Sequence, residues 1–205
     1  MLRSHHTKGA RLYADRFEMI VGLAQAESFS QVCEVGVAKG TFSNHLMATL
    51  CPDRFYAIDV FKMHDAEPFW GKSAEEHFFG KTHREFYEAT IERVALAKGV
   101  KTEIMTGLSW DCMAKLPENG LDFIYLDADH SFDAVQRDIK AAARAIRPGG
   151  VIVFNDYITY DHHTGKPYGV VQAANAFIVE RDCEVLGFAL QAQMYCDIAV
   201  RVPGN

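Results

Sequence analysis

Long hydrophobic runs are missing from this sequence of 205 residues. No stretch approaches the roughly 18 uninterrupted apolar residues that a membrane-spanning helix needs. The polar start MLRSHHTKGARLY also lacks the apolar centre of a signal peptide. We therefore expect no membrane association and a cytoplasmic location.

Closely spaced cysteine pairs are absent as well. The five cysteines are odd in number and widely separated, with no C-x-x-C motif, so neither a zinc site nor a disulfide framework is indicated. In the cytosol such residues are normally kept reduced. We expect structural thiols.

An excess of positive charge is the third feature that the sequence lacks. The chain has 21 lysine and arginine residues against 27 aspartate and glutamate residues, which gives a net charge of −6. A protein with this balance has no overall positive field to attract a phosphate backbone, so we expect no nucleic-acid partner. The one basic group, Arg3, Lys8, Arg11 and Arg16, is interpreted as a solvated helix face.

The residues that are present are typical of a globular domain. Apolar residues make up 49% of the chain and charged residues 23%, which are ordinary proportions. A chain of this length can bury about 70% of its unfolded surface around one core. We expect one domain over residues 1–205, with residues 1–30 as a helical lead-in that contains a helix at 12–26.

Strand and helix patterns alternate along the rest of the chain. Short apolar runs predict strands at 31–37, 54–60, 101–105, 121–127, 151–156, 183–190 and 195–202. Helical spacing predicts helices at 41–50, 82–98, 110–115, 132–146 and 169–181, and Pro148-Gly149-Gly150 is expected to end the helix at 132–146. This order predicts an α/β fold: a Rossmann-like, doubly wound, seven-stranded sheet, mostly parallel, with helices on both faces and a C-terminal antiparallel hairpin.

The first strand-to-helix turn has the composition of a nucleotide-binding turn. In E-V-G-V-A-K-G-T-F-S (34–43) a strand ends in an acidic residue and glycine, and a helix follows at once. Asp59 ends the next strand about 20 residues further on, where a carboxylate can accept both ribose hydroxyls. An NAD enzyme is the competing interpretation, but its G-x-G-x-x-G pattern is replaced here by G-x-x-x-G. An adenosine cofactor without a pyrophosphate is favoured.

This turn resembles the E-x-G-x-x-x-G-x-S opening of catechol O-methyltransferase-like enzymes, with one extra residue before the serine. By this resemblance the chain is similar, over nearly its whole length, to class I S-adenosylmethionine-dependent methyltransferases. The resemblance implies that Glu34, Gly36 and Ser43 surround the methionine part of the cofactor and that Gly40 belongs to the same binding loop. It also implies that Asp59 binds the ribose and that Ser109 lies on the adenine side.

A second resemblance rests on Y-L-D-A-D-H-S-F-D-A-V-Q-R-D-I and R-P-G-G-V-I-V-F-N-D-Y. These segments are similar to the group that includes macrocin O-methyltransferase (methyltransferase domain 24). The resemblance implies that Asp127, Asn155 and Asp156 hold a divalent cation, and that Asp127 also contacts the cofactor and takes part in catalysis. His130 is then the base, at the place where catechol-type enzymes have lysine.

Three oxygen ligands of this kind suit Mg²⁺ or another hard divalent cation. A cation at this place would lower the pKa of a coordinated hydroxyl, and a histidine, whose ordinary pKa is near 6.5, could take up the released proton. Asp129 or Asp133 could orient His130. Asn155-Asp156 could also be a plain turn, which would leave the enzyme independent of metal.

We therefore expect an O-methyltransferase that acts on a hydroxyl of a small molecule, such as a sugar-bearing natural product or a phenol. The alternatives are a metal-independent methyltransferase of the same fold and a non-catalytic cofactor-binding or interaction protein. N-methylation is disfavoured because Asn155-Asp156-Tyr157 lacks both prolines of an N-P-P-Y motif.

Two long loops, 61–80 and 157–169, are rich in aromatic residues. Long loops often form lids or binding loops, but the same aromatic residues would suit the interface of a homo-oligomer. The sequence leaves both readings open. The aromatic residues concerned are Phe61, Phe69, Trp70, Phe78, Phe79, Tyr157, Tyr160 and Tyr168.

Overall fold

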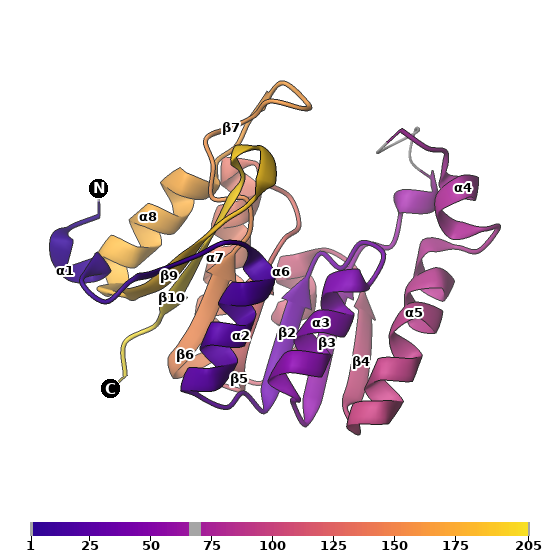
Figure 1. Cartoon of the computed structure of the whole chain (residues 1–205), viewed down its shortest axis with the longest axis horizontal. Coiled ribbons are helices and arrows are strands. Elements are labelled where there is room, and N and C mark those ends of the chain that lie inside the picture. Colours follow the sequence, from indigo (N-terminus) through magenta and orange to yellow (C-terminus); the bar gives the residue numbers. More distant parts are fainter. Residues whose placement is uncertain (1, 66–70, 205) are drawn as a thin grey trace.

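The computed structural model describes residues 2–65 and 71–204, and its centre is one eight-stranded sheet (Figure 1). In spatial order the strands are β1 (Arg11–Tyr13), β9 (Glu184–Leu190), β10 (Cys196–Arg201), β6 (Ile146–Phe154), β5 (Leu121–Leu126), β2 (Gln31–Val35), β3 (Arg54–Asp59) and β4 (Lys101–Thr106). The strands from β6 to β4 are parallel, and β10 is antiparallel to both β6 and β9. The predicted α/β class, doubly wound parallel sheet and closing hairpin are confirmed.

Helices cover both faces of the sheet, as predicted. One face packs against α2 (Arg16–Ala26), α3 (Thr41–Leu50) and α5 (His83–Lys98), and the other against α6 (Ser109–Met113), α7 (Phe132–Ala145) and α8 (Val170–Arg181). The smaller elements are α1 (Ser4–Thr7), η1 (Met63–Asp65), α4 (Ala74–Phe78), β7 (Tyr160–Asp161), β8 (Lys166–Pro167) and η2 (Ala192–Met194). Figure 1 shows that β7 and α4 both rise above the carboxyl ends of the parallel strands.

The central strand β5 shows why the sheet needs two helical layers. Phe123 and Tyr125 pack into the core beneath α2, α3 and α5, whereas Ile124 and Leu126 pack into the core beneath α6, α7 and α8. Successive side chains of a strand point to opposite faces, so an apolar run without alternation must be covered on both sides. Each fully buried side chain of this size stabilises the fold by about 1.5–3 kcal/mol.

The N-terminal lead-in differs from the prediction. The expected helix at 12–26 begins only at Arg16, because Arg11–Tyr13 form an eighth strand that pairs in parallel with β9. Asp15 sets the new helix start: its Oδ1 accepts a hydrogen bond of 2.8 Å from the Glu18 amide. The extra strand is paired with residues more than 170 positions away, so no local pattern indicates it.

The segment Pro148-Gly149-Gly150 also differs from its predicted role. Helix α7 ends at Ala145, and the tripeptide lies inside β6 instead of in a connecting turn. Gly149 donates its amide hydrogen to Val202 over 3.0 Å, and Val202 donates to Gly150 over 2.9 Å. Pairing with the C-terminal segment therefore extends the strand toward the helix. Over residues 2–65 and 71–204, no helix is both long and apolar enough to span a lipid bilayer.

Candidate functional site

A cavity of about 630 Å³ opens at the carboxyl ends of the parallel strands. Ligands of doubly wound sheets bind at this edge. The wall includes four of the residues that the sequence singled out: Gly36 after β2, Asp59 at the end of β3, Ser109 after β4 and Asp127 after β5. The cavity therefore extends across four neighbouring strands.

Gly36 joins three strand ends in a space that excludes any side chain. Its amide donates to Ile58 over 2.8 Å, and the Asp127 amide donates to Val35 over 2.7 Å. Gly36 has a φ of +83°, and an added Cβ would lie 1.8 Å from the Asp127 carbonyl oxygen. Only glycine combines this backbone angle with this approach.

Asp59 ties two loops together at the cavity wall. Its Oδ2 accepts a hydrogen bond of 2.9 Å from the Val37 amide, and its Oδ1 accepts one of 2.8 Å from the Phe61 amide. A carboxylate oxygen can accept more than one hydrogen bond. Both oxygens therefore keep acceptor capacity for a ligand in the cavity.

Glu34, Gly40 and Ser43 are not among the residues that line the cavity. The Ser43 hydroxyl donates to the Glu34 carboxyl group, and Tyr87 donates to Ser43 Oγ over 3.1 Å. Burial raises the pKa of Glu34 to about 8, although the Ser43 hydrogen bond opposes this shift. Gly40 begins α3 with a φ of +81° and faces the Tyr87 ring. These three residues support the binding loop from beneath it.

The residues predicted at the ends of β5 and β6 come together. His130 Nε2 lies 3.7 Å from Asp127 Oδ1 and 3.7 Å from Asp156 Oδ2. This nitrogen is buried and has no hydrogen-bond partner among the described residues. An imidazole nitrogen thus faces two carboxylates beside the cavity wall.

The orientation of His130 depends on Tyr168, a residue that the sequence placed only in a loop. The two rings stack with centroids 4.6 Å apart and planes 6° from parallel. Asp129, which was expected to orient the histidine, instead accepts a hydrogen bond of 2.7 Å from the Ser131 amide. Burial lowers the pKa of His130, and the Asn155 side chain partly opposes this shift.

A buried aspartate on β10 organises the same cluster from below. Asp197 is fully buried and accepts hydrogen bonds from Tyr125 over 2.5 Å, from Asn155 Nδ2 over 3.0 Å and from Gln191 over 2.6 Å. The sequence analysis missed Asp197. A carboxylate in the middle of the apolar strand C-D-I-A-V-R (196–201) was the one available signal.

Negative charge dominates this part of the site. Burial raises the pKa of Asp127 well above its ordinary value and raises the pKa of Asp156 and Asp197 to about 6 in each case. Arg16 opposes all three shifts. The interpretation of Arg16 as part of a solvated helix face is wrong, because helix α2 begins at the cavity and its first side chain lines the wall.

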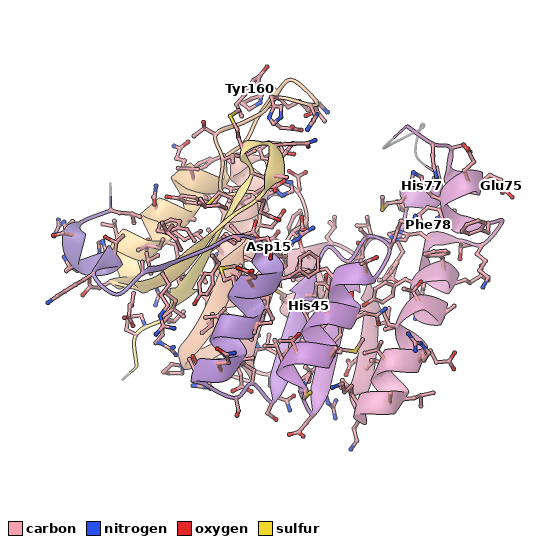
Figure 2. All side chains as sticks on the ribbon, in the orientation of Figure 1. Asp15, His45, Glu75, His77, Phe78 and Tyr160 are labelled. Carbon is pink, nitrogen blue, oxygen red and sulfur yellow. The ribbon has the colours of Figure 1, made fainter. Side chains whose placement is uncertain are left out.

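The two aromatic loops contain short elements that the sequence did not predict. In 61–80, Phe61 and Phe78 are buried and pack on either side of His83, whereas Phe79 is exposed. Phe69 and Trp70 lie outside the described residues. The side chains of His77 and Phe78 on α4 are labelled in Figure 2.

In 157–169, strands β7 and β8 form a small hairpin around Asp161. The Asp161 carboxylate accepts hydrogen bonds from Tyr195 over 2.5 Å, from Tyr168 over 3.3 Å and from the His163 amide over 2.9 Å. Tyr160 extends from this hairpin into solvent (Figure 2). The ring that stacks on His130 is therefore anchored to the hairpin.

The one group of three His, Cys, Asp or Glu residues with all candidate ligand atoms within 4.8 Å, over the described ranges, is His5, His6 and Asp182. His6 Nδ1 accepts a hydrogen bond of 3.0 Å from the Arg3 amide, and His6 Nε2 lies 3.2 Å from Asp182. Because Nδ1 is the acceptor, the neutral ring carries its proton on Nε2. This group therefore fastens the N-terminal segment to the end of α8.

Comparison with known proteins gives one family and many similar folds. A family model described as a methyltransferase domain matches residues 33–157, which include the motifs around Gly36, Asp127 and Asp156 but exclude Arg16. No curated protein sequence matches the chain.

Among solved structures, the chain is similar to an O-methyltransferase from Bacillus cereus in complex with S-adenosylhomocysteine, with 18% identity, a TM-score of 0.63 and coverage of 91% of this chain and 80% of that one. It is also similar to the O-methyltransferase TomG from Streptomyces achromogenes, with 18% identity, a TM-score of 0.62 and coverage of 92% and 80%. The N-methyltransferase NodS from Bradyrhizobium japonicum WM9 has 16% identity, a TM-score of 0.57 and coverage of 92% and 94%. At these identities the likeness concerns the fold, which O- and N-methyltransferases share.

Proposed function

This chain belongs to the methyltransferase domain family, and we propose that it transfers the methyl group of S-adenosylmethionine to a hydroxyl group of a small molecule. The observation that carries the proposal is the position of His130. Its unpartnered Nε2 lies beside Asp127, which is itself part of the cavity wall. A proton acceptor thus stands next to the space that a cofactor would occupy.

The cofactor would lie along the four strand ends. Asp59 would accept hydrogen bonds from the ribose hydroxyls, Ser109 would lie near the adenine, and Gly36 would allow close approach of the backbone. Glu34, Gly40 and Ser43 would support this loop without touching the cofactor. We further propose that residues 1–205 act as a single domain, since the lead-in at 1–30 contributes both a strand of the sheet and Arg16 of the cavity wall.

In the proposed reaction the acceptor oxygen attacks the methyl carbon in line with the carbon–sulfur bond. The oxygen–carbon bond forms, the carbon–sulfur bond breaks, and S-adenosylhomocysteine leaves as a neutral thioether. The hydroxyl proton passes to His130 Nε2, whose stacking on Tyr168 holds the ring in place. A positioned base of this kind typically contributes about 10²- to 10⁴-fold to the rate.

A divalent cation such as Mg²⁺ fits the donor set of this site. Asp127, Asn155 and Asp156 supply oxygen atoms, which hard cations prefer, and the buried carboxyl groups carry more negative charge than Arg16 alone balances. Asn155 uses its amide nitrogen to bind Asp197, so its oxygen is the atom left for a cation. When bound there, the cation would polarise the acceptor hydroxyl.

A metal-independent methyltransferase is the second candidate, and Arg16 favours it. Its Nη1 lies 3.6 Å from Asp127 Oδ2, so one of the presumed metal ligands already has a positive neighbour. Dialysis against a chelator separates the two candidates. Loss of methyl transfer that Mg²⁺ restores supports the cation, and full activity in chelator supports the metal-independent enzyme.

The acceptor is proposed to be a hydroxylated small molecule, either a sugar-bearing natural product or a phenol. Nucleic acid is disfavoured by the net charge of −6. The experiment is a screen with S-adenosylmethionine labelled in the methyl group against sugars, phenols, amines and carboxylic acids. Transfer to hydroxyl compounds supports the proposal, and transfer only to amines contradicts it.

A further inference from the structure

Arg16 is a cation at the cavity with most of its hydrogen-bonding capacity unused. It is the first residue of α2, and its guanidinium group lies over the Phe42 ring at 4.8 Å. Nη1 donates to the Tyr125 hydroxyl over 3.3 Å, and among the described residues this is the one hydrogen bond that the group makes. The buried Nε has no partner. A guanidinium group offers five N–H donors.

We propose that Arg16 binds the α-carboxylate of S-adenosylmethionine while Asp127 binds its α-ammonium group, an inference that rests on the proposed function. The amino-acid part of this cofactor is a zwitterion, with one negative and one positive group on the same carbon. Arg16 and Asp127 present the opposite charges side by side at the cavity wall. The planar guanidinium group is suited to bind a carboxylate through two hydrogen bonds.

The distance between the two side chains supports this assignment. At 3.6 Å, Arg16 Nη1 and Asp127 Oδ2 are further apart than a good N–H···O hydrogen bond allows. The pair is therefore close enough to offset the charges in the empty cavity without using up the donors and acceptors. A zwitterion between them would give each charged group a direct partner.

The order of the strands decides which end of the cofactor reaches Arg16. Asp127 follows β5, Gly36 follows β2, Asp59 ends β3 and Ser109 follows β4, and these strands are neighbours in that order. If the adenosine occupies the β3 and β4 end, the amino-acid part must extend toward β5. Arg16 stands there, next to Asp127.

This assignment moves the methionine subsite away from the residues that the sequence motif suggested. Glu34 and Ser43 are bonded to each other beneath the loop, whereas Arg16 comes from the lead-in helix, outside the matched residues 33–157. The N-terminal lead-in would therefore complete the cofactor site.

The test is a calorimetric comparison of truncated ligands. S-adenosylhomocysteine contains the whole amino-acid part, decarboxylated S-adenosylhomocysteine keeps only the amine, and 5′-methylthioadenosine lacks both groups. For Arg16→Ala we expect the affinity for S-adenosylhomocysteine to fall about 10- to 100-fold, the range of one charge-assisted pair. The affinities for the other two ligands should change by less than about threefold, because neither has a carboxylate. Arg16→Lys should lie between, since it keeps the charge but loses the planar fork.

Arg11→Ala is the matched control, because it removes the same charge from an exposed residue of β1. It should leave all three affinities unchanged. Asp59→Ala should weaken all three ligands together, since each contains the ribose. Retained binding of 5′-methylthioadenosine by Arg16→Ala also shows that the variant is folded.

Two results would overturn the assignment: an equal loss for all three ligands in Arg16→Ala, or no loss for any of them. A wild-type protein that binds none of the ligands would instead contradict the proposed function. The two failures are therefore distinguishable.

Discussion

The two halves of the site are built in different ways. The β2–β3 half consists of the loop around Gly36 and the Asp59 carboxylate, and its hydrogen bonds join residues within 34–61 to the backbone of the neighbouring strands. The β5–β6 half consists of Asp127, His130, Asn155 and Asp156 with their partners. Those partners are drawn from Arg16 at one end of the chain to Asp197 at the other.

The comparison teaches that a backbone-built subsite tolerates little change, whereas a side-chain-built subsite can be altered residue by residue. In the β2–β3 half, an added methyl group meets a carbonyl oxygen that cannot move without displacing a strand end. In the β5–β6 half, each side chain has several partners, so the loss of one leaves others in place. Four substitutions test this difference.

Gly36→Ala should have the largest effect. The new Cβ would lie 1.8 Å from the Asp127 carbonyl oxygen at a φ of +83°, so we expect loss of measurable S-adenosylhomocysteine binding. Destabilisation should exceed the roughly 1–2 kcal/mol that a left-handed backbone alone costs. Calorimetry and thermal melting measure both effects.

Gly99→Ala is the matched control for Gly36→Ala, because Gly99 has a similar φ of +69° but no atom within 4 Å of an added Cβ. Its melting temperature should fall by about 2–8 °C, with ligand binding intact. Equal effects of the two substitutions would show that the close approach to Asp127 is unimportant.

His130→Ala should have the next largest effect, and it should be confined to chemistry. We expect kcat for the acceptor found in the screen to fall about 10²- to 10⁴-fold. The affinity for S-adenosylhomocysteine should stay nearly constant, because His130 does not line the main cavity. Steady-state kinetics and calorimetry separate the two quantities.

His45→Ala, on the outer side of α3 (Figure 2), removes a histidine away from the cavity and should leave both kcat and affinity unchanged. If His130→Ala retained the wild-type kcat, the assignment of this residue as the base would be wrong.

Glu34→Gln should change how stability depends on pH. Burial raises the pKa of Glu34 to about 8 in the folded protein, from 4.5 in its absence. The unfolded chain therefore releases this proton at lower pH, and the group's contribution to stability falls as pH rises from about 4.5 to about 8, by at most about 1.4 kcal/mol per pH unit. Glutamine can still accept the Ser43 hydrogen bond but does not ionise.

Melting temperatures of the wild type and Glu34→Gln, measured between pH 5 and pH 8.5, test this point. The variant should gain relative to the wild type as the pH rises. Parallel curves would mean that Glu34 is ionised beneath the loop at neutral pH, and the neutral support assigned to the β2–β3 half would be incorrect.

Asp197→Ala should have the smallest of the four effects. It leaves the hydrogen-bond donors of Tyr125, Asn155 and Gln191 without their acceptor, which costs about 1–3 kcal/mol for buried groups. The melting temperature should fall by about 2–12 °C. Glu118→Ala, an exposed acidic residue, is the control and should melt like the wild type. A loss as large as that of Gly36→Ala would erase the contrast between the two halves.

Much of the fold was predictable because the signals are local. Helix α3 has the predicted bounds Thr41–Leu50, and α5 begins after Thr82, whose side chain accepts a hydrogen bond from the Glu85 amide. Apolar periodicity and capping residues act within a few positions of the chain. The same is true of Gly36 and Asp59, whose spacing follows from one strand–helix–strand unit.

The sequence by itself determined the alternating strands and helices, the edge of the sheet where the site lies, and the grouping of Asp127, His130 and Asp156 at neighbouring strand ends. Only the tertiary structure decided that Arg11–Tyr13 form a strand, that Arg16 faces the cavity, that Tyr168 stacks on His130 and that Asp197 lies beneath the cluster. Each of these depends on a partner distant in sequence or on the way the whole sheet closes. Local propensities carry no information about such contacts, because the contacts exist only once the sheet and its helices have packed.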